Sequence, residues 1–258
     1  LTTDSTNLTC FQSNDGAASV TVSGGTFPYR YAWSPNTDTI SSLTGLAAGV
    51  YTVTVTDRNL CINSVSFNIT QPTQLVTSET HTNISCFGDV TGAVYITASG
   101  SVPPYTYTWN PNVSTVDSAV NVGAANYSVT VADANGCSVV QASNVTQPPL
   151  LALNPIVSDV LCNGGNTGAI DAGVTGGVPT YNFSANDGTN NYTSTSGQFT
   201  SLYAGNYSIT VTDQNTCSAS VAVTVSQSNV LSATADTFPS LCYHASNGRI
   251  VVSPIGGV

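Results

Sequence analysis

The sequence lacks methionine and lysine altogether, and only 6% of its 258 residues are charged. Three arginines face 13 acidic residues, which gives a formal net charge of −10. So few cations cannot form a surface that neutralises phosphates, and nucleic acid is therefore excluded as a partner. No apolar run approaches the roughly 20 residues of a membrane-spanning helix, so we expect no membrane insertion by this segment. The opening residues do not read as a signal peptide, and the missing methionine indicates an interior piece of a longer chain.

Groups for acid–base or metal chemistry are equally scarce. Apolar residues form 41% of the chain, which suffices for a core, while the low charge leaves Ser, Thr, Asn, Gln and Gly for the surface. The only glutamate, Glu79, and the two histidines, His81 and His244, do not recur at a regular interval. No general acid–base pair and no nucleophile motif can be assembled from them, so we expect no enzyme activity.

The cysteines show that the chain repeats itself at an interval of about 76 residues. They alternate between two positions, called here the first and the second cysteine of each repeat. The first cysteines are Cys10, Cys86, Cys162 and Cys242, and the second cysteines are Cys61, Cys137 and Cys217. This spacing predicts repeats at 1–72, 73–148 and 149–228, and the truncated start of a fourth at 229–258. Four extra residues in the third repeat, around 185–190, are rich in turn formers and predict a loop insertion.

Within each repeat, apolar residues alternate with hydroxyl residues, as in the run from Tyr51 to Thr56. Alternation with a period of two is typical of a β-strand with one buried and one wet face. About six or seven such short runs occur in each repeat, and none has a helical period. The sequence therefore predicts an all-β fold, a tandem array of small immunoglobulin-like antiparallel β-sandwiches.

Two cysteines in each complete repeat are the number needed for one disulfide bond per domain. We therefore predict the pairs Cys10–Cys61, Cys86–Cys137 and Cys162–Cys217, with Cys242 left single by the truncation of its repeat. Such bonds persist outside the cytosol, so we expect an extracellular location. Buried unpaired cysteines are the alternative, and a metal site is disfavoured because the sequence has no C-x-x-C motif.

Other motifs keep the same interval as the cysteines. In the first repeat they are Cys10 with Gly16, Gly-Gly-Thr-Phe-Pro-Tyr-Arg-Tyr-Ala-Trp at 24–33, a segment from Leu46 to Asp57, and the closing Gln71-Pro72. In this combination the chain resembles the SprB-type repeats of large surface adhesins of gliding Bacteroidetes. The third repeat departs from the pattern, because Ala185 stands where the tryptophan is expected.

The resemblance implies export by type IX secretion, display on the cell surface, and a place in a long adhesin, often one moved by the gliding motility machinery. We expect a non-enzymatic, semi-rigid repeat rod that projects adhesive regions and bears load, with further repeats of the same chain as partners. Two alternatives stay open. One is a structural subunit of an extracellular filament or sheath that contacts neighbouring filament chains, and the other is a carbohydrate-binding repeat array that recognises surface glycans.

Aromatic residues in the 24–33 segment form a stripe on one face of a predicted strand. Tyr29, Tyr31 and Trp33 are two residues apart, so their side chains project together, either into the core or onto a sugar-stacking platform. We interpret Trp33 as core, the place where immunoglobulin-like domains bury a tryptophan. Tyr51 resembles the tyrosine corner of such domains only loosely, since it stands ten residues before a cysteine rather than two, and we expect a packing role.

Acidic residues recur at one strand end of each repeat. Asp57, Asp133 and Asp213 each stand two residues before an asparagine, a pair that predicts an Asx-type turn. The same aspartates are the best calcium candidates, although calcium requires about six to eight oxygen ligands. We expect no other cofactor. Short Asp-Ser/Thr-apolar motifs, of a kind that Bacteroidetes O-glycosylate, make three further residues glycosylation candidates: Ser5, Thr39 and Ser118.

Overall fold

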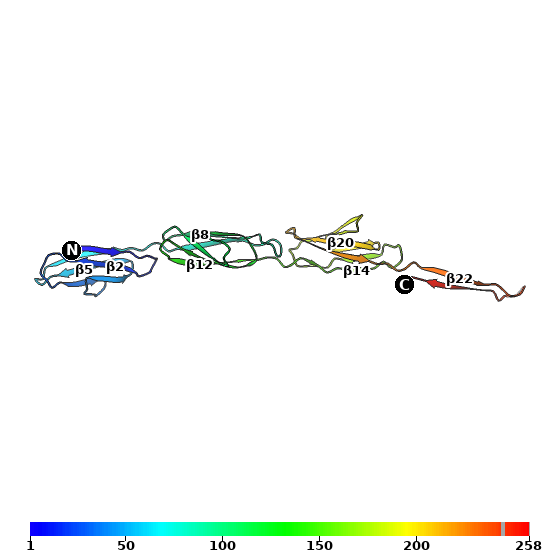
Figure 1. Cartoon of the computed structure of the whole chain (residues 1–258), viewed down its shortest axis with the longest axis horizontal. Helices are drawn as coiled ribbons and strands as arrows, with labels where there is room; N and C mark the ends of the chain where they lie inside the picture. Colours follow the sequence, from blue (N-terminus) through cyan, green and yellow to red (C-terminus); the bar gives the residue numbers. More distant parts are fainter. Residues whose placement is uncertain (244–245, 258) are drawn as a thin grey trace. The chain divides into compact units, whose positions relative to one another are not determined.

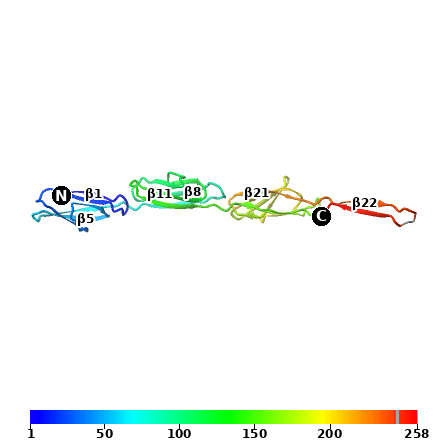
Figure 2. The same cartoon turned by 60° about the horizontal axis from the view of Figure 1, so that its bottom comes forward.

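The computed structural model describes residues 1–243 and 246–257, so His244 lies outside the described residues. The described part consists of β-strands, turns and loops, as the two views in Figure 1 and Figure 2 show. No helix in it is long and apolar enough to cross a membrane. The all-β prediction is therefore confirmed.

The strands follow the predicted repeats in order along the chain. The first range holds β1 (Thr2–Thr6), β2 (Gly16–Thr21), β3 (Arg30–Ser34), β4 (Ser42–Leu46), β5 (Gly49–Thr56) and β6 (Ile62–Ile69). The second holds β7 (Val76–Thr82), β8 (Gly92–Ser99), β9 (Thr106–Asn110), β10 (Ser118–Val122), β11 (Ala125–Ala132) and β12 (Ser138–Val145).

The third range has additional short strands. It holds β13 (Ala152–Leu153), β14 (Ile156–Ser158), β15 (Gly168–Asp171), β16 (Val174–Thr175), β17 (Asn182–Asn186), β18 (Asn191–Ser194), β19 (Gln198–Leu202), β20 (Gly205–Thr212) and β21 (Ser218–Val225). The last range holds the antiparallel hairpin of β22 (Ser232–Phe238) and β23 (Arg249–Ile255), whose residues are all exposed.

Each of the first two ranges forms two three-stranded antiparallel sheets. In the first range their orders are β1-β2-β4 and β3-β5-β6, and in the second β7-β8-β10 and β9-β11-β12. This connectivity is that of an immunoglobulin sandwich with sheets A-B-E and C-F-G and without strand D. The immunoglobulin-like prediction is therefore confirmed.

The chain divides into two compact units. One consists of Leu1–Asn83 and Thr91–Val145, and the other of Ile84–Val90 together with the chain from Thr146 onward. Every hydrogen-bonded sheet nevertheless lies within one of the four predicted ranges, which stay our proposal for the repeats. The segment Ile84–Val90, which carries Cys86, belongs with the unit that contains the third range.

Alternation along β5 produces the core of the first sandwich. Tyr51, Val53 and Val55 are buried, whereas the threonines between them are partly exposed. Trp33 is buried on the neighbouring strand β3, where its ring lies 5.5 Å from that of Phe67 and its indole Nε1 donates to the Ile40 carbonyl at 2.8 Å. The core interpretation of Trp33 is therefore confirmed.

The third repeat builds the same core without a tryptophan. Ala185 pairs with Ile209, as Trp33 pairs with Val53 in the first repeat, and it is fully buried. Phe183 and Phe199 are buried beside it and supply the missing aromatic volume. Core volume is therefore shared among strands rather than fixed at one position.

The predicted loop insertion in the third repeat is only partly right, because residues 187–190 form a turn but the residues after them form a strand. Strand β18 pairs with β17 and extends the sheet to the order β18-β17-β20-β21. Asp187 closes the turn by accepting from the backbone N–H of Asn190 at 2.7 Å and of Thr189 at 2.8 Å. These bonds, that to Asn190 above all, lower the pKa of Asp187 to about 2.

A tyrosine corner is present in all three complete repeats. The hydroxyl of Tyr51 donates to the carbonyl of Ala47 at 3.1 Å, four residues upstream. Tyr127 and Tyr207 make the equivalent bonds at 2.8 and 3.0 Å, so the expectation of a packing role alone was incomplete. The bond fixes the turn that leads into the central strand of each β3-β5-β6-type sheet.

Replacing Tyr127 with Phe should lower the unfolding free energy of the second repeat by about 1 kcal/mol, since it removes one hydrogen bond and no core volume. The measurement is denaturant unfolding followed by tryptophan fluorescence. Every protein compared carries Trp33→Phe, so that the fluorescence comes from Trp109 in the second repeat. Tyr95→Phe, at an exposed tyrosine of β8, is the control and should change nothing. Equal midpoints for Tyr127→Phe and Tyr95→Phe would show that the corner contributes no stability.

Candidate functional site, the disulfide junctions

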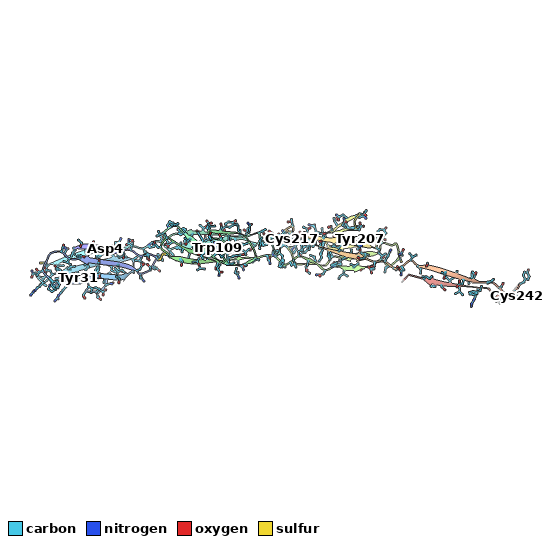
Figure 3. The ribbon with its side chains drawn as sticks, viewed as in Figure 1. Asp4, Tyr31, Trp109, Tyr207, Cys217 and Cys242 are labelled. Carbon is cyan, nitrogen blue, oxygen red and sulfur yellow. A yellow bond between two sulfur atoms is a disulfide. The ribbon has the colours of Figure 1, made fainter. Side chains whose placement is uncertain are left out.

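The disulfide bonds join successive repeats. Cys10 bonds to Cys137 with their Cα atoms 5.7 Å apart, and Cys86 bonds to Cys217 with their Cα atoms 5.6 Å apart. In each case the first cysteine of one repeat bonds to the second cysteine of the next, and Figure 3 labels Cys217 in the second of these bonds. The predicted pairs within repeats are therefore wrong: Cys10–Cys61, Cys86–Cys137 and Cys162–Cys217.

Distance explains why no bond forms within a repeat. The turn that holds Cys10 lies at the end of β6, because the Leu8 N–H donates to the Thr70 carbonyl at 3.0 Å. Cys61 immediately precedes the start of the same strand. Eight residues of extended strand separate the two ends by roughly 27 Å, whereas bonded cysteines need Cα atoms within about 7 Å.

A buried aspartate organises the turn that carries each second cysteine. In the second repeat, Oδ1 of Asp133 accepts from the backbone N–H of Asn135 at 2.9 Å and of Cys137 at 2.8 Å. Its Oδ2 accepts from the Ser101 hydroxyl and from the Val102 N–H. These bonds, led by that from Ser101, lower the pKa of Asp133. The cysteine is thereby held at the tip of a fixed turn.

The same turn recurs in the other complete repeats. Asp57 accepts from the N–H groups of Asn59, Cys61 and Thr26, and Asp213 accepts from those of Asn215, Cys217 and Val178. The bonds from Thr26 and then Cys61 lower the pKa of Asp57. The Asx-type turn predicted from the sequence is therefore present in all three.

The asparagine of this turn binds across the junction. The side-chain amide of Asn135 donates to the Thr9 carbonyl at 2.8 Å, and that of Asn215 donates to the Ser85 carbonyl at 2.9 Å. Thr9 and Ser85 immediately precede the first cysteines of their repeats. Each junction is thus held by a disulfide bond and by an adjacent hydrogen bond.

The glutamine that closes each repeat holds the first-cysteine turn. The Oε1 atoms of Gln71, Gln147 and Gln227 accept from the backbone N–H two residues after the first cysteine, at 2.9, 2.7 and 2.7 Å. From the sequence we interpreted the closing glutamine, Gln71 in the first repeat, only as a repeat boundary. The recurrence of these glutamines ten residues after each second cysteine was the signal that could have drawn attention to them.

In the first repeat a carboxylate also supports the first-cysteine turn. Asp15 accepts from the backbone N–H of Thr9 at 3.1 Å and from the hydroxyls of Ser13 and Thr9. These bonds, that of Ser13 above all, lower the pKa of Asp15 to about 2. Two aspartates, Asp15 and Asp133, therefore order the two sides of the Cys10–Cys137 bond.

The remaining candidate sites have the following surroundings. The oxygens of Asp57, Asp133 and Asp213 accept backbone N–H bonds, and no group of three or more potential metal ligands occurs in residues 1–243 and 246–257. Calcium binding stays a prediction. Ser5 lies exposed in β1, Thr39 lies exposed before β4, and Ser118 begins β10 half-buried; their glycosylation also stays a prediction.

Comparisons with known proteins give a match to one repeat family and matches to several solved structures. The SprB repeat family matches residues 2–38, 78–114 and 154–190. Among solved structures, Sidekick-1 immunoglobulin domains 1–5 match at 11% identity with a TM-score of 0.33, covering 77% of this chain and 52% of that one. This chain thus spans about half of that structure.

Two further structures match over most of this chain. Extracellular domains 3–5 of Drosophila OTK match at 12% identity with a TM-score of 0.32, covering 87% of this chain and 91% of that one. Domains 7, 8 and 9 of the S-layer protein SbsC match at 12% identity with a TM-score of 0.22, covering 76% and 79%. No curated protein matches the chain.

Digestion with a protease that cleaves before aspartate separates the possible disulfide pairs. After free thiols are blocked, we expect peptide 4–14 joined to 133–158, and 57–88 joined to 213–235. Pairs within repeats would instead join 4–14 to 57–88 and 159–170 to 213–235. Recovery of either of the latter species by mass spectrometry under non-reducing conditions would overturn the junctions.

Acid should loosen the Cys10–Cys137 junction. The pKa of Asp133 is lowered from 3.8, so its hydrogen bonds stabilise the fold fully above pH 3.8 and are lost as the pH falls through the lowered value. A phosphine reductant should therefore reduce the Cys10–Cys137 bond several-fold faster at pH 2 than at pH 5. Each rate is divided by the rate at which the same reductant reduces oxidised glutathione in the same buffer, which corrects for the pH dependence of the reductant. In the Asp133→Asn variant, the Cys10–Cys137 bond should be reduced faster at pH 5, and its reduction rate should depend less on pH. If the substitution leaves the dependence of this rate on pH unchanged, the Asp133 carboxylate does not stabilise the junction.

Proposed function

Because this chain is an SprB-type repeat region, we propose that it is a stalk segment of a cell-surface adhesin in which disulfide bonds carry tension from repeat to repeat. The observation that carries the proposal is the pairing of Cys10 with Cys137 and of Cys86 with Cys217. Bonds that join neighbours serve a continuous array, whereas bonds within domains would stabilise each domain separately.

The covalent path supports a mechanical role. Tension that reaches the second repeat enters at Cys137, passes back along the chain to Cys86, and crosses the next bond to Cys217. The linker after Cys137, including Gln147 and Pro148, lies outside this path. A pull on the array therefore loads the folded sandwich between its two cysteines and spares the connection between repeats.

The surface setting of the proposal rests on redox chemistry and on composition. Disulfide bonds persist in oxidising compartments, and a surface of uncharged polar residues suits a protein exposed outside the cell. We propose that export by type IX secretion and a part in gliding motility follow from membership of this family. We also propose that the segment is non-enzymatic, since its buried carboxylates are engaged by backbone amides.

The alternative of a carbohydrate-binding array receives less support. A sugar-stacking platform needs exposed aromatic faces, but Trp33 and Trp109 are buried and donate their indole N–H groups to backbone carbonyls at 2.8 Å. Figure 3 labels Trp109 within the second sandwich. The third repeat has alanine at this position. The tryptophans are thus part of the core of the stalk.

Pulling the chain by its ends tests the role in tension. With both bonds closed, tension passes through residues 1–10, 86–137 and 217–258, about 100 residues that extend to roughly 350 Å. This length is the limit of extension of the oxidised chain. A reductant should raise the limit of extension to roughly 880 Å, the length of the whole extended chain. Equal limits with and without reductant would remove the proposed role.

Single substitutions assign the tension to particular bonds. Cys10→Ser should lengthen the oxidised limit to roughly 430 Å, because tension then runs through residues 1–86 before it crosses to Cys217. Cys61→Ser, at a cysteine outside both bonds, is the matched control and should leave the limit unchanged. A longer limit for Cys61→Ser would contradict the path through the junctions.

A further inference from the structure

The exposed end of the first repeat has the features of a junction without its partner. Cys61 occupies the same turn position as Cys137 and Cys217, and it is exposed and unbonded, whereas those two are half-buried in disulfide bonds. We propose that this end is a docking site for the first-cysteine turn of another repeat of the same type, closed by a disulfide bond to Cys61. The inference rests on the two observed junctions and not on adhesion or tension.

The hydrogen bonds of the turn are already formed. Asp57 accepts from the N–H of Asn59 at 2.8 Å and of Cys61 at 2.9 Å, as Asp133 and Asp213 do at the occupied junctions. The cysteine is therefore presented at its bonding position before a partner arrives. Such preorganisation reduces the ordering that docking requires.

The asparagine differs between the open and the occupied state. At the occupied junctions, the amides of Asn135 and Asn215 donate to the carbonyl that precedes the incoming cysteine. In the first repeat the amide of Asn59 donates instead to the Thr26 hydroxyl of its own repeat, at 3.1 Å. An incoming turn would supply the carbonyl that Asn59 lacks.

Exposed apolar side chains surround Cys61. Phe27, Leu60 and Ile62 are 77%, 80% and 69% exposed, and a hollow beside them is lined by Gly25 and Cys61 among others. The equivalent residues of the second repeat, which lie at an occupied junction, are smaller: Pro103, Gly136 and Ser138. The open end thus has apolar surface that docking would remove from water.

A matching first-cysteine turn exists within this chain. Cys162 is an exposed, unbonded first cysteine, and its turn is held by Gln227, as the turns of Cys10 and Cys86 are held by Gln71 and Gln147. The adjacent Leu161 is 67% exposed and offers an apolar side chain to the open end. A second copy of the chain can therefore serve as the partner, with its Cys162 facing Cys61.

The bond forms by thiol–disulfide exchange with a small-molecule disulfide. The thiolate of Cys162 attacks that disulfide and releases one small thiol, leaving a mixed disulfide. The thiolate of Cys61 then attacks the sulfur of Cys162 and releases the second small thiol. Two protein thiols lose two electrons and two protons, and one small disulfide is reduced to two thiols, so atoms and electrons balance.

The test uses the whole chain with Cys242→Ser, so that Cys61 and Cys162 are the only free cysteines. Incubation with oxidised glutathione at high protein concentration should give disulfide-linked dimers and longer head-to-tail chains. Mass spectrometry of the digest should find peptide 57–88 joined both to 213–235, through Cys86, and to 159–170, through Cys61. Products linked through two Cys61 or two Cys162 side chains, or no linked products, would overturn the docking site.

An additional Asn59→Ala substitution separates docking from mere thiol exposure. Without the amide, the yield of the Cys61–Cys162 product should fall about fivefold, the effect of one lost hydrogen bond. Alkylation of Cys61 by iodoacetamide should keep its rate, because that reaction needs no docked partner. Asn68→Ala, at an exposed asparagine near the other end of β6, is the matched control. Equal coupling yields for Asn59→Ala and Asn68→Ala would show that Cys61 reacts without recognition of its partner.

Discussion

The length of one strand determines how this array is held together. The two cysteines of the first repeat flank opposite ends of β6, which has eight residues, and this separation is several times the span of a disulfide bond. Bonds can therefore form only where the end of one sandwich meets the beginning of another. The two bonds of the structure, Cys10–Cys137 and Cys86–Cys217, both follow this rule.

Core and junction tolerate sequence change to different degrees. Ala185 replaces a tryptophan in the core of the third repeat, and Phe199 on another strand supplies volume in its place. The junction allows less exchange, because Asp133, Asn135 and Cys137 each make a directed bond. Volume can be redistributed among neighbours, but a hydrogen bond or a disulfide bond needs particular atoms in particular places.

The sequence predicted the sandwiches because a period of two reports directly on strands, and it predicted the Asp-x-Asn turn because that pairing acts locally. It could not predict the disulfide pairs, because cysteines that recur at one interval fit bonds within repeats and bonds between repeats equally well. Strand β18 was missed because the turn formers around Asp187 suggested a loop and the short strand after them was not recognised. The tyrosine corner was missed because its distance was counted to Cys61 rather than to the carbonyl of Ala47.

The pairing rule also gives the array a direction. A bond between the first cysteine of one repeat and the second cysteine of the next uses two different surfaces, so the contact is heterologous and does not close on itself as a twofold dimer does. An array with this rule has one bond fewer than its repeats and leaves a second cysteine at one end and a first cysteine at the other. These ends are chemically complementary, as Cys61 beside Asn59 and Cys162 beside Leu161 illustrate. Because each junction presents the same pair of surfaces, the array can lengthen by whole repeats without any change in the bond that joins them.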